Sequence, residues 1–243
     1  MRAWCRFLTA LVSVGALQLF GAGISSGYDS QTLQYSGGRG FFMGGANNIN
    51  IGGLNTRLKN NGYREFSETC ISFGGGGYGL LNRLVIGGEG FGVLSGDRSG
   101  VVGSETFKTT LRGGYGLFKL GYVIYKRGGF NIYPAVGIGG GGITLDIGKK
   151  ETVPFDDILK SPKRNVQLTT GCLLIDIGVG ADYLMILDRK NTGDEGGLAF
   201  GVRVGYLAAP YRSDWGDALD GPDIGFEGFY FRLMFGGGGG KNK

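Results

Sequence analysis

Six charged side chains form the set in this sequence that is most able to do chemistry. They are three acids and three arginines on one parity of alternating segments: Glu89, Arg112, Asp176, Asp182, Arg203 and Arg232. Successive side chains of a β-strand point to opposite faces, so charges of one parity share a side of a sheet. Such a set could line a path for a polar substrate or supply two carboxylates for acid–base chemistry. The simpler interpretation is a charge-compensated plug inside a narrow barrel, because buried charges must be paired.

The sequence contains no histidine. This excludes the Ser–His and Cys–His nucleophile arrangements and removes the commonest metal ligand and neutral-pH proton shuttle. The glycine run 74–79, GGGGYG, does not match a phosphate-binding loop, which needs a Lys followed by Ser or Thr between a strand and a helix. We therefore expect no enzyme, no cofactor and no metal site.

Three cysteines, Cys5, Cys70 and Cys172, show no C-x-x-C spacing. Cys5 lies in a segment that we expect to be removed. Cys70 and Cys172 fall near opposite walls of the predicted barrel, and a disulfide needs Cα atoms within about 7 Å. We expect two separate buried thiols, with a bond possible only in a flattened barrel.

Aromatic residues near one end of the segment 198–208 are the remaining candidates for contacts. Tyr211 and Trp215 are predicted to contact a ligand at the surface or, with Tyr206, to form an aromatic girdle at a membrane interface. The segments 53–62 and 149–165 are the best candidates for a binding role, because loops on a rigid scaffold commonly carry function.

The elements that must position these residues are strands. Apolar and polar residues alternate in the hairpin 67–95, which contains two strands, and in six further segments at about 39–51, 104–125, 130–148, 166–187, 198–208 and 224–235. Between the first two strands, Leu54 and Leu58 share a helical face and Gly62 is the expected stop, which predicts a short helix over 53–62. Glycine, at 53 of 243 residues, fits a strongly curved closed sheet. The sequence therefore predicts an all-β fold, an eight-stranded antiparallel up-and-down β-barrel with a short helical insert.

The charge parity changes within the segment 104–125. Lys108 and Arg112 lie on one parity and Lys119 lies on the other. Glycines at 113, 114 and 116 separate them, and this arrangement predicts a β-bulge at that point.

The two ends of the chain differ from its middle. Residues 1–24 carry Arg2 and Arg6 before an apolar run and small residues, which predicts a signal peptide for export. Whether it is cleaved or kept as an anchor is left open. We expect a flexible leader over 25–38, the barrel over 39–235 and a glycine-rich tail over 236–243. The net charge of +5 comes from scattered residues, so no nucleic-acid partner is expected.

Connections at one end of the predicted barrel are long or polar and those at the other are mostly short, and each strand has the 9–11 residues that cross a membrane. With the predicted signal and the aromatic last strand, residues 39–235 resemble the small eight-stranded outer-membrane barrels of Gram-negative bacteria. The stretch GGGGYGLLNRLVIGGEGFG also looks like a glycine-rich family of uncharacterised bacterial proteins. The resemblance implies an outer-membrane location with both termini periplasmic, a lipid environment and the barrel assembly machinery as partner. It also implies Phe235 as the assembly signal, although the residues after it depart from the pattern.

Three functions remain open at this point. The preferred one is a non-enzymatic outer-membrane barrel with a structural, adhesive or ligand-binding surface role, its ligand unknown. The second is a narrow pore or transporter for small or apolar molecules. The third is a secreted soluble barrel with a ligand in its lumen, which predicts the inverse pattern of apolar residues inward and polar residues outward.

Overall fold

The computed structural model describes residues 35–150, 154–160, 165–189, 194–216 and 218–242. Eight long strands follow one another in the described chain: β1 (Tyr35–Asn48), β2 (Thr69–Leu81), β3 (Leu84–Val102), β4 (Glu105–Tyr122), β6 (Phe130–Lys149), β7 (Asn165–Arg189), β8 (Asp194–Arg212) and β9 (Gly228–Asn242). A three-residue strand, β5 (Tyr125–Arg127), pairs with β6 near the end of β4. Two helices, α2 (Gly52–Asn60) and α3 (Phe155–Lys160), lie in connections.

The long strands form one closed antiparallel ring. Consecutive long strands pair with each other, β9 returns to pair with β1, and β4 pairs directly with β6 beside the short β5. The predicted eight-stranded up-and-down barrel is confirmed. The predicted helix over 53–62 is confirmed as α2, in which Leu54 and Leu58 are buried, and Gly62 follows it with a φ of +81°.

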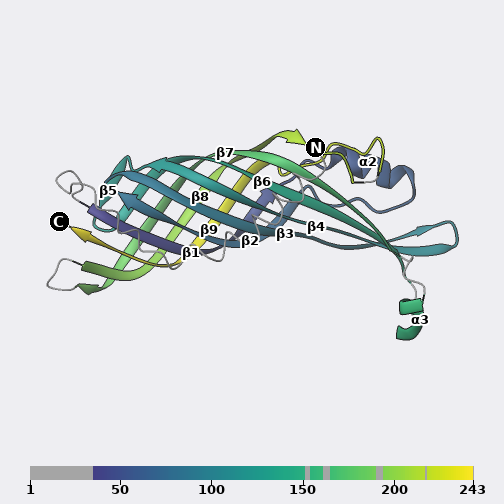
Figure 1. Ribbon diagram of the computed structural model, residues 1–243, viewed down its shortest axis with the longest axis horizontal. Coiled ribbons are helices and arrows are strands. Elements are labelled where there is room, and N and C mark those ends of the chain that lie inside the picture. The colour runs from purple at the N-terminus through teal and green to yellow at the C-terminus, as the bar shows by residue number, and fades with distance from the viewer. Residues whose placement is uncertain (1–34, 151–153, 161–164, 190–193, 217, 243) are drawn as a thin grey trace.

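Figure 1 shows the strands tilted along an elongated barrel with unlike ends. We call the end with α2 and α3 the loop end, and the end with β5, the start of β1 and the finish of β9 the turn end. At the turn end β2 passes into β3 through Asn82 and Arg83, and Asn82 has a φ of +58°, which Asn tolerates better than most residues. At the loop end β3, β4, β6 and β7 extend beyond the other strands as a four-stranded sheet.

Both strands at the closing seam are longer than predicted. β1 begins at Tyr35, inside the predicted leader, and residues 25–34 lie outside the described residues, as does the predicted signal peptide. The prediction of a tail over 236–243 is wrong, because Gly236 to Gly240 pair with β1 on one side and β8 on the other. Glycines in an unknown register look like a linker in sequence, but here two neighbouring backbones supply their hydrogen-bond partners.

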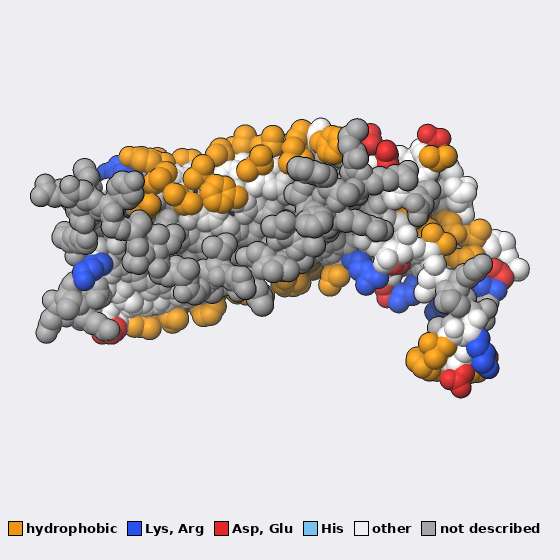
Figure 2. All heavy atoms as spheres, in the orientation of Figure 1, with side chains coloured by type: hydrophobic (Ala, Val, Ile, Leu, Met, Phe, Trp, Pro, Cys, Tyr) orange, Lys and Arg blue, Asp and Glu red, His pale blue; other side chains and the backbone are white. Residues whose placement is uncertain are grey.

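The two faces of the wall differ in chemistry. Aliphatic and aromatic side chains of all eight long strands point outward and are exposed, among them Phe42, Phe73, Leu84, Phe118, Ile138, Ile177, Val204 and Phe231. Figure 2 shows hydrophobic side chains along the upper and lower edges of the barrel body, with charged side chains mainly at the loop end. The opposite parity is buried and carries the charged and tyrosine side chains of the lumen.

The loop end is closed by an apolar core. Its buried members come from α2 and from the connections beside it: Ile49, Ile51, Leu54, Leu58, Phe66, Trp215, Ile224 and Phe226. Asn55 binds the backbone N–H and carbonyl of Phe66 through its side-chain amide, at 2.9 Å each. This pair fixes the segment that follows α2 to the helix. No helix among the described residues is both long and apolar enough to cross a membrane.

Candidate functional site

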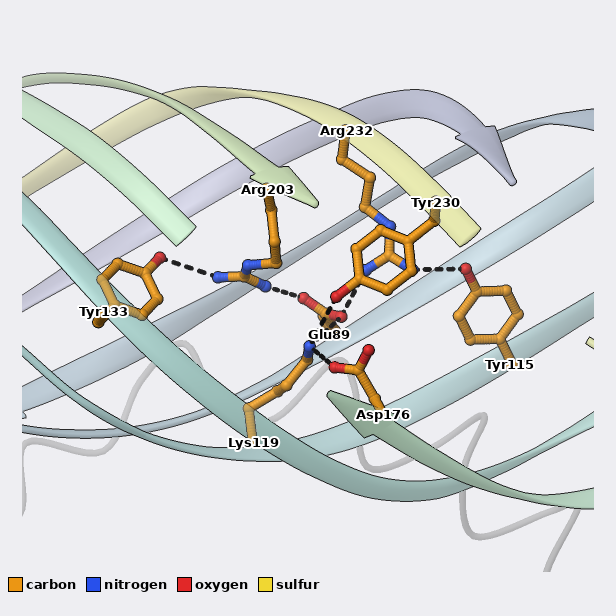
Figure 3. A network of polar contacts seen from close by, with 8 residues as sticks. All are labelled: Glu89, Tyr115, Lys119, Tyr133, Asp176, Arg203, Tyr230 and Arg232. Atoms are coloured by element: carbon orange, nitrogen blue, oxygen red, sulfur yellow. Dashed lines mark hydrogen bonds and ion pairs between the residues drawn. The ribbon is translucent and has the colours of Figure 1, made fainter. Parts of the chain in front are cut away.

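Glu89 is the centre of a polar network in the lumen (Figure 3). Its carboxylate accepts hydrogen bonds from Arg203 and, at 2.6 Å, from Arg232, and the Lys119 ammonium lies 3.3 Å from the same carboxylate. Lys119 also pairs with Asp176. These five side chains come from β3, β4, β7, β8 and β9, so the network ties together most of the barrel's circumference. All five are buried.

Arg232 is fully buried between two aromatic rings. Its guanidinium carbon lies 3.9 Å from the ring centre of Phe91 and 3.8 Å from that of Tyr230, and Nη2 donates to the Tyr115 hydroxyl at 2.8 Å. Arginine suits this position because its planar group stacks on aromatic faces while its edge donates several hydrogen bonds. Removal of this side chain would leave a gap between two rings as well as an altered charge.

A second cluster lies nearer the turn end. Arg39 pairs with Asp182, and the Tyr78 hydroxyl donates to the same carboxylate at 2.5 Å. Arg39 also donates to the carbonyl of Gly129 at 3.0 Å, which joins β1 to the turn before β6. The two clusters are bridged by the aromatic contact between Tyr78 and Tyr133, whose ring centres lie 5.5 Å apart.

Five of the six predicted lumen charges lie in these two clusters: Glu89, Asp176, Asp182, Arg203 and Arg232. Two cations, Arg39 and Lys119, were not predicted. The described lumen thus holds four cations, Arg39, Lys119, Arg203 and Arg232, against three acids, which leaves one positive charge in excess. Both missed residues share the inward parity of their strands, so a correct register would have found them.

Arg112 was placed in the lumen wrongly. It points outward and binds Asp146 with Nε at 2.8 Å and Nη2 at 2.6 Å, and 54% of its side chain is exposed. The predicted bulge is also wrong, because β4 pairs with β6 without interruption from Phe107 to Gly121. Arg112 and Lys119 have opposite parity simply because they face opposite sides of one regular strand. The register shift near these residues lies in β3, between residues 94 and 97.

Inward-facing glycines make room for the lumen aromatics. A Cβ on Gly180 would lie 2.6 Å from the Tyr133 ring, and one on Gly205 would lie 2.5 Å from the Tyr230 hydroxyl oxygen. Real Cβ atoms do not approach so closely, so the tyrosines can lie against the wall only where the wall lacks side chains. These inward-facing glycines and the large aromatic side chains of the lumen therefore depend on each other for their packing.

The lumen is filled rather than open. A small cavity, of about 10 Å³, lies between the two clusters and is lined by Tyr78, Glu89, Lys119, Tyr133 and Arg203, among others. A cavity of this size holds about one water molecule. On the loop side of the network the apolar core continues the plug. This arrangement supports the plug interpretation of the charges over a substrate path. The described residues contain no group of three or more Cys, Asp and Glu side chains that could hold a metal ion.

The two predicted surface aromatics fall in different environments. Tyr211 is exposed. Trp215 is buried, and its Nε1 donates to the carbonyl of Pro222 at 2.7 Å, so it is part of the apolar core rather than the surface. The aromatic side chain of Trp215 suggested a membrane interface, but it packs inside the core at the loop end.

The cysteines and the predicted assembly signal lie apart from the lumen network. Cys70 and Cys172 are free and buried. Phe235 points outward and packs on Phe200, with ring centres 5.2 Å apart. It lies in the middle of β9 rather than at its end, because the strand continues through the glycines that follow.

Comparison with known proteins gives a distant likeness to solved structures. No family model matches the chain, and no curated protein matches it. One similar structure is that of Ail, the attachment invasion locus protein of Yersinia pestis, in complex with the heparin analogue sucrose octasulfate. It has 8% identity and a TM-score of 0.42, and the match covers 86% of this chain and 99% of Ail. The outer membrane protein OprG of Pseudomonas aeruginosa has 14% identity and a TM-score of 0.33, with 87% and 97% covered. The fold assignment rests on the strand pairing within this chain.

Proposed function

We propose that this protein is a non-enzymatic outer-membrane β-barrel whose filled lumen makes it a rigid scaffold for the structures at its loop end. The observation that carries the proposal is the division of the wall, with charged and tyrosine side chains inward and apolar side chains outward on all eight long strands. A soluble barrel with an apolar ligand site inside would need the inverse division.

The outward surface also changes along the barrel as a membrane environment requires. Between Gly114 and Tyr122 of β4 the outward side chains are uncharged, and Phe118, Leu120 and Tyr122 are exposed. Toward the loop end the same face becomes polar at Arg112 and stays polar to the end of the strand. A hydrocarbon layer excludes such charges, so we place the membrane boundary at Arg112.

The filled lumen favours a surface role over a pore. A porin-type channel needs a continuous aqueous path, whereas the cavity in this lumen holds about one water molecule. The loop end instead carries a packed apolar core and a protruding four-stranded sheet, which could present a binding surface. The absence of histidine from the sequence agrees with a function that needs no proton shuttle.

This proposal includes the route to the membrane. We propose that residues 1–24 direct export and that the barrel assembly machinery inserts the chain with Phe235 as part of its signal. The first and last residues of the ring, Tyr35 and Asn242, lie at the turn end, so both face the periplasm when the loop end faces outward.

Membrane fractionation with a heat-modifiability gel tests the location, and planar-bilayer conductance tests the scaffold role. We expect recovery in the outer membrane, a mobility difference between unheated and boiled samples, and no steady ion current. Recovery as a soluble periplasmic protein would refute the membrane proposal. A reproducible unitary current from the purified barrel would refute the plugged scaffold and support the pore.

A further inference from the structure

An ordered polar surface stands on the outer side of β3, β4, β6 and β7, directly above the membrane boundary proposed above. The strand registers align its side chains in three rows: Arg112, Thr144 and Thr169 beside Leu94; then Asp97, Thr110, Asp146 and Gln167; then Ser99, Lys108 and Asn165 with Gly148 between the last two. We call this set the polar face. Its members are fixed by the sheet rather than carried on a loop.

Hydrogen bonds and ion pairs hold the side chains of the polar face in place. Asp146 accepts from Arg112 and, at 3.0 Å, from Gln167. Asp97 lies 2.6 Å from the Lys108 ammonium and accepts a hydrogen bond at 2.7 Å from the hydroxyl of residue 110. The fixed carboxylates accept hydrogen bonds from sugar hydroxyls, and the amides and hydroxyls both donate and accept. The cations of Lys108 and Arg112 are the donors that a phosphate requires.

A second feature lies immediately below the polar face on the same four strands. The next row toward the turn end consists of four glycines, Gly92, Gly114, Gly142 and Gly171, and the row below it contains Gly90, Gly116 and Gly140 beside Leu173. These seven glycines face outward and expose bare backbone. We call them the glycine shelf.

Packing within the barrel does not account for all of the shelf. A Cβ on Gly92 or Gly90 would meet nothing closer than 3.9 or 3.7 Å, and one on Gly142 nothing closer than 3.5 Å, which are ordinary contact distances. By contrast, a Cβ on inward-facing Gly139 would overlap the carbonyl oxygen of Gly116 on the neighbouring strand. Glycine within a strand costs about 0.5–1 kcal/mol relative to alanine. At Gly90, Gly92 and Gly142 that cost has no compensation within the fold.

We propose that the polar face and the glycine shelf together bind one amphipathic ligand, a phosphorylated glycolipid of the outer leaflet. The acyl part lies flat on the shelf, where bare backbone allows close contact, and the saccharide head lies against the polar face. The inference rests on the proposed membrane location, which sets the shelf in the hydrocarbon layer and the polar face above it.

The height of the polar face favours a glycolipid over a phospholipid. Its three rows span about 13 Å along the strands, or roughly 10 Å along the barrel axis after the usual tilt. The head-group layer of an ordinary bilayer is only about 5–8 Å thick on each side. A phosphodiester head would leave the row farthest from the membrane boundary without a partner, whereas two or three sugar rings reach that row.

The experiment compares lipid retention by the purified full-length barrel in detergent. Purified rough lipopolysaccharide and, separately, phosphatidylglycerol are added, and bound lipid is counted by native mass spectrometry. Gly92→Leu with Gly142→Leu fills the shelf, and the Cβ added at these positions would have 3.9 and 3.5 Å of space. Gly79→Leu is the matched control, because Gly79 also faces outward and its Cβ would also have 3.9 Å of space, but it lies outside the shelf.

A second pair of variants tests the polar face in the same assay. Lys108→Ala with Arg112→Ala removes two cations of the polar face, both of which are exposed. Lys59→Ala is the control, because it removes an exposed cation of α2 that lies outside the polar face.

We expect at least a tenfold loss of lipopolysaccharide retention in both double variants and none in the controls, with every variant still heat-modifiable. Equal retention by the shelf variant and Gly79→Leu would overturn the inference, as would phosphatidylglycerol binding that equals lipopolysaccharide binding. A wild-type chain recovered as soluble protein would refute the proposed membrane location instead. A heat-modifiable barrel that retains no lipopolysaccharide would refute the inference alone.

Discussion

Replacement of Glu89 by glutamine tests whether the lumen network holds the barrel together. Glutamine keeps the shape of the side chain but removes the negative charge that compensates Arg203, Arg232 and Lys119. The excess charge of the described lumen rises from one to two. Removal of one partner from a buried ion pair typically costs about 3–5 kcal/mol because the other charge stays buried. The remaining amide oxygen still accepts a hydrogen bond, so we expect a loss of about 3 kcal/mol, or roughly a 150-fold change in the unfolding constant.

The assay is reversible urea unfolding of the barrel in lipid vesicles, followed by tryptophan fluorescence and by the heat-modifiable band. Arg112→Ala is the control, because it removes an exposed ion pair, for which about 0–1 kcal/mol is expected. Arg232→Met with Glu89→Gln returns the lumen to its wild-type charge excess, and the methionine can fill the space between Phe91 and Tyr230. We expect this double variant to be more stable than Glu89→Gln alone. A Glu89→Gln barrel within about 1 kcal/mol of wild type would show that the network does not stabilise the fold.

Three further predictions concern glycine, tryptophan and a surface acid. Gly205→Val should prevent folding into the heat-modifiable form because its side chain would clash with Tyr230. Gly92→Ala should fold and raise the free energy of unfolding by about 0.5–1 kcal/mol. Equal folding yields for the two variants would contradict this prediction. Trp215 is buried, so in a chain cleaved after the predicted signal its emission should be blue-shifted and poorly quenched by acrylamide; efficient quenching would refute the apolar core. Hydrogen bonds from Lys108 and Thr110 lower the pKa of Asp97, so its small stabilisation is present above its unfolded pKa and lost as the pH falls through the folded one. Asp97→Asn should remove this part of the acid dependence of the unfolding midpoint, and an unchanged profile would count against it.

The sequence was sufficient for the architecture because alternation, short turns and the α2 pattern are local signals. The pair Leu54 and Leu58, the stop at Gly62 and the turn at Asn82 depend only on neighbouring residues. The extent of β1 and β9 could not be predicted in the same way. Their ends pair glycine with glycine, as in the pairing of residue 37 with residue 240, and glycine carries no parity.

The lumen network was predictable only as far as the register was. Glu89, Asp176 and Arg203 lie on strands whose apolar residues fix the parity, and all three are buried in the lumen. Arg112 lies above the apolar part of β4, and four residues that include three glycines separate it from the apolar segment that begins at Leu117. Arg112 shares the parity of Phe118, which faces outward, so it could be placed outside the lumen only by carrying the parity of the apolar segment across those glycines.

The run of four glycines at 139–142 shows why residue type alone does not reveal function here. Gly139 and Gly141 face the lumen, where a Cβ would overlap a backbone oxygen or lie 2.7 Å from the Tyr115 Cβ, so the fold requires them. Gly142 faces outward, where a Cβ would have 3.5 Å of space, so the fold does not require it. Alternate residues of one glycine run therefore have different constraints: the inner ones are set by lumen packing, and the outer ones by the surface that faces lipid in the proposed membrane location. In a substitution series along this run, we expect variants at the inward-facing positions to lose folding. We expect variants at the outward-facing positions to fold and to lose only lipid retention.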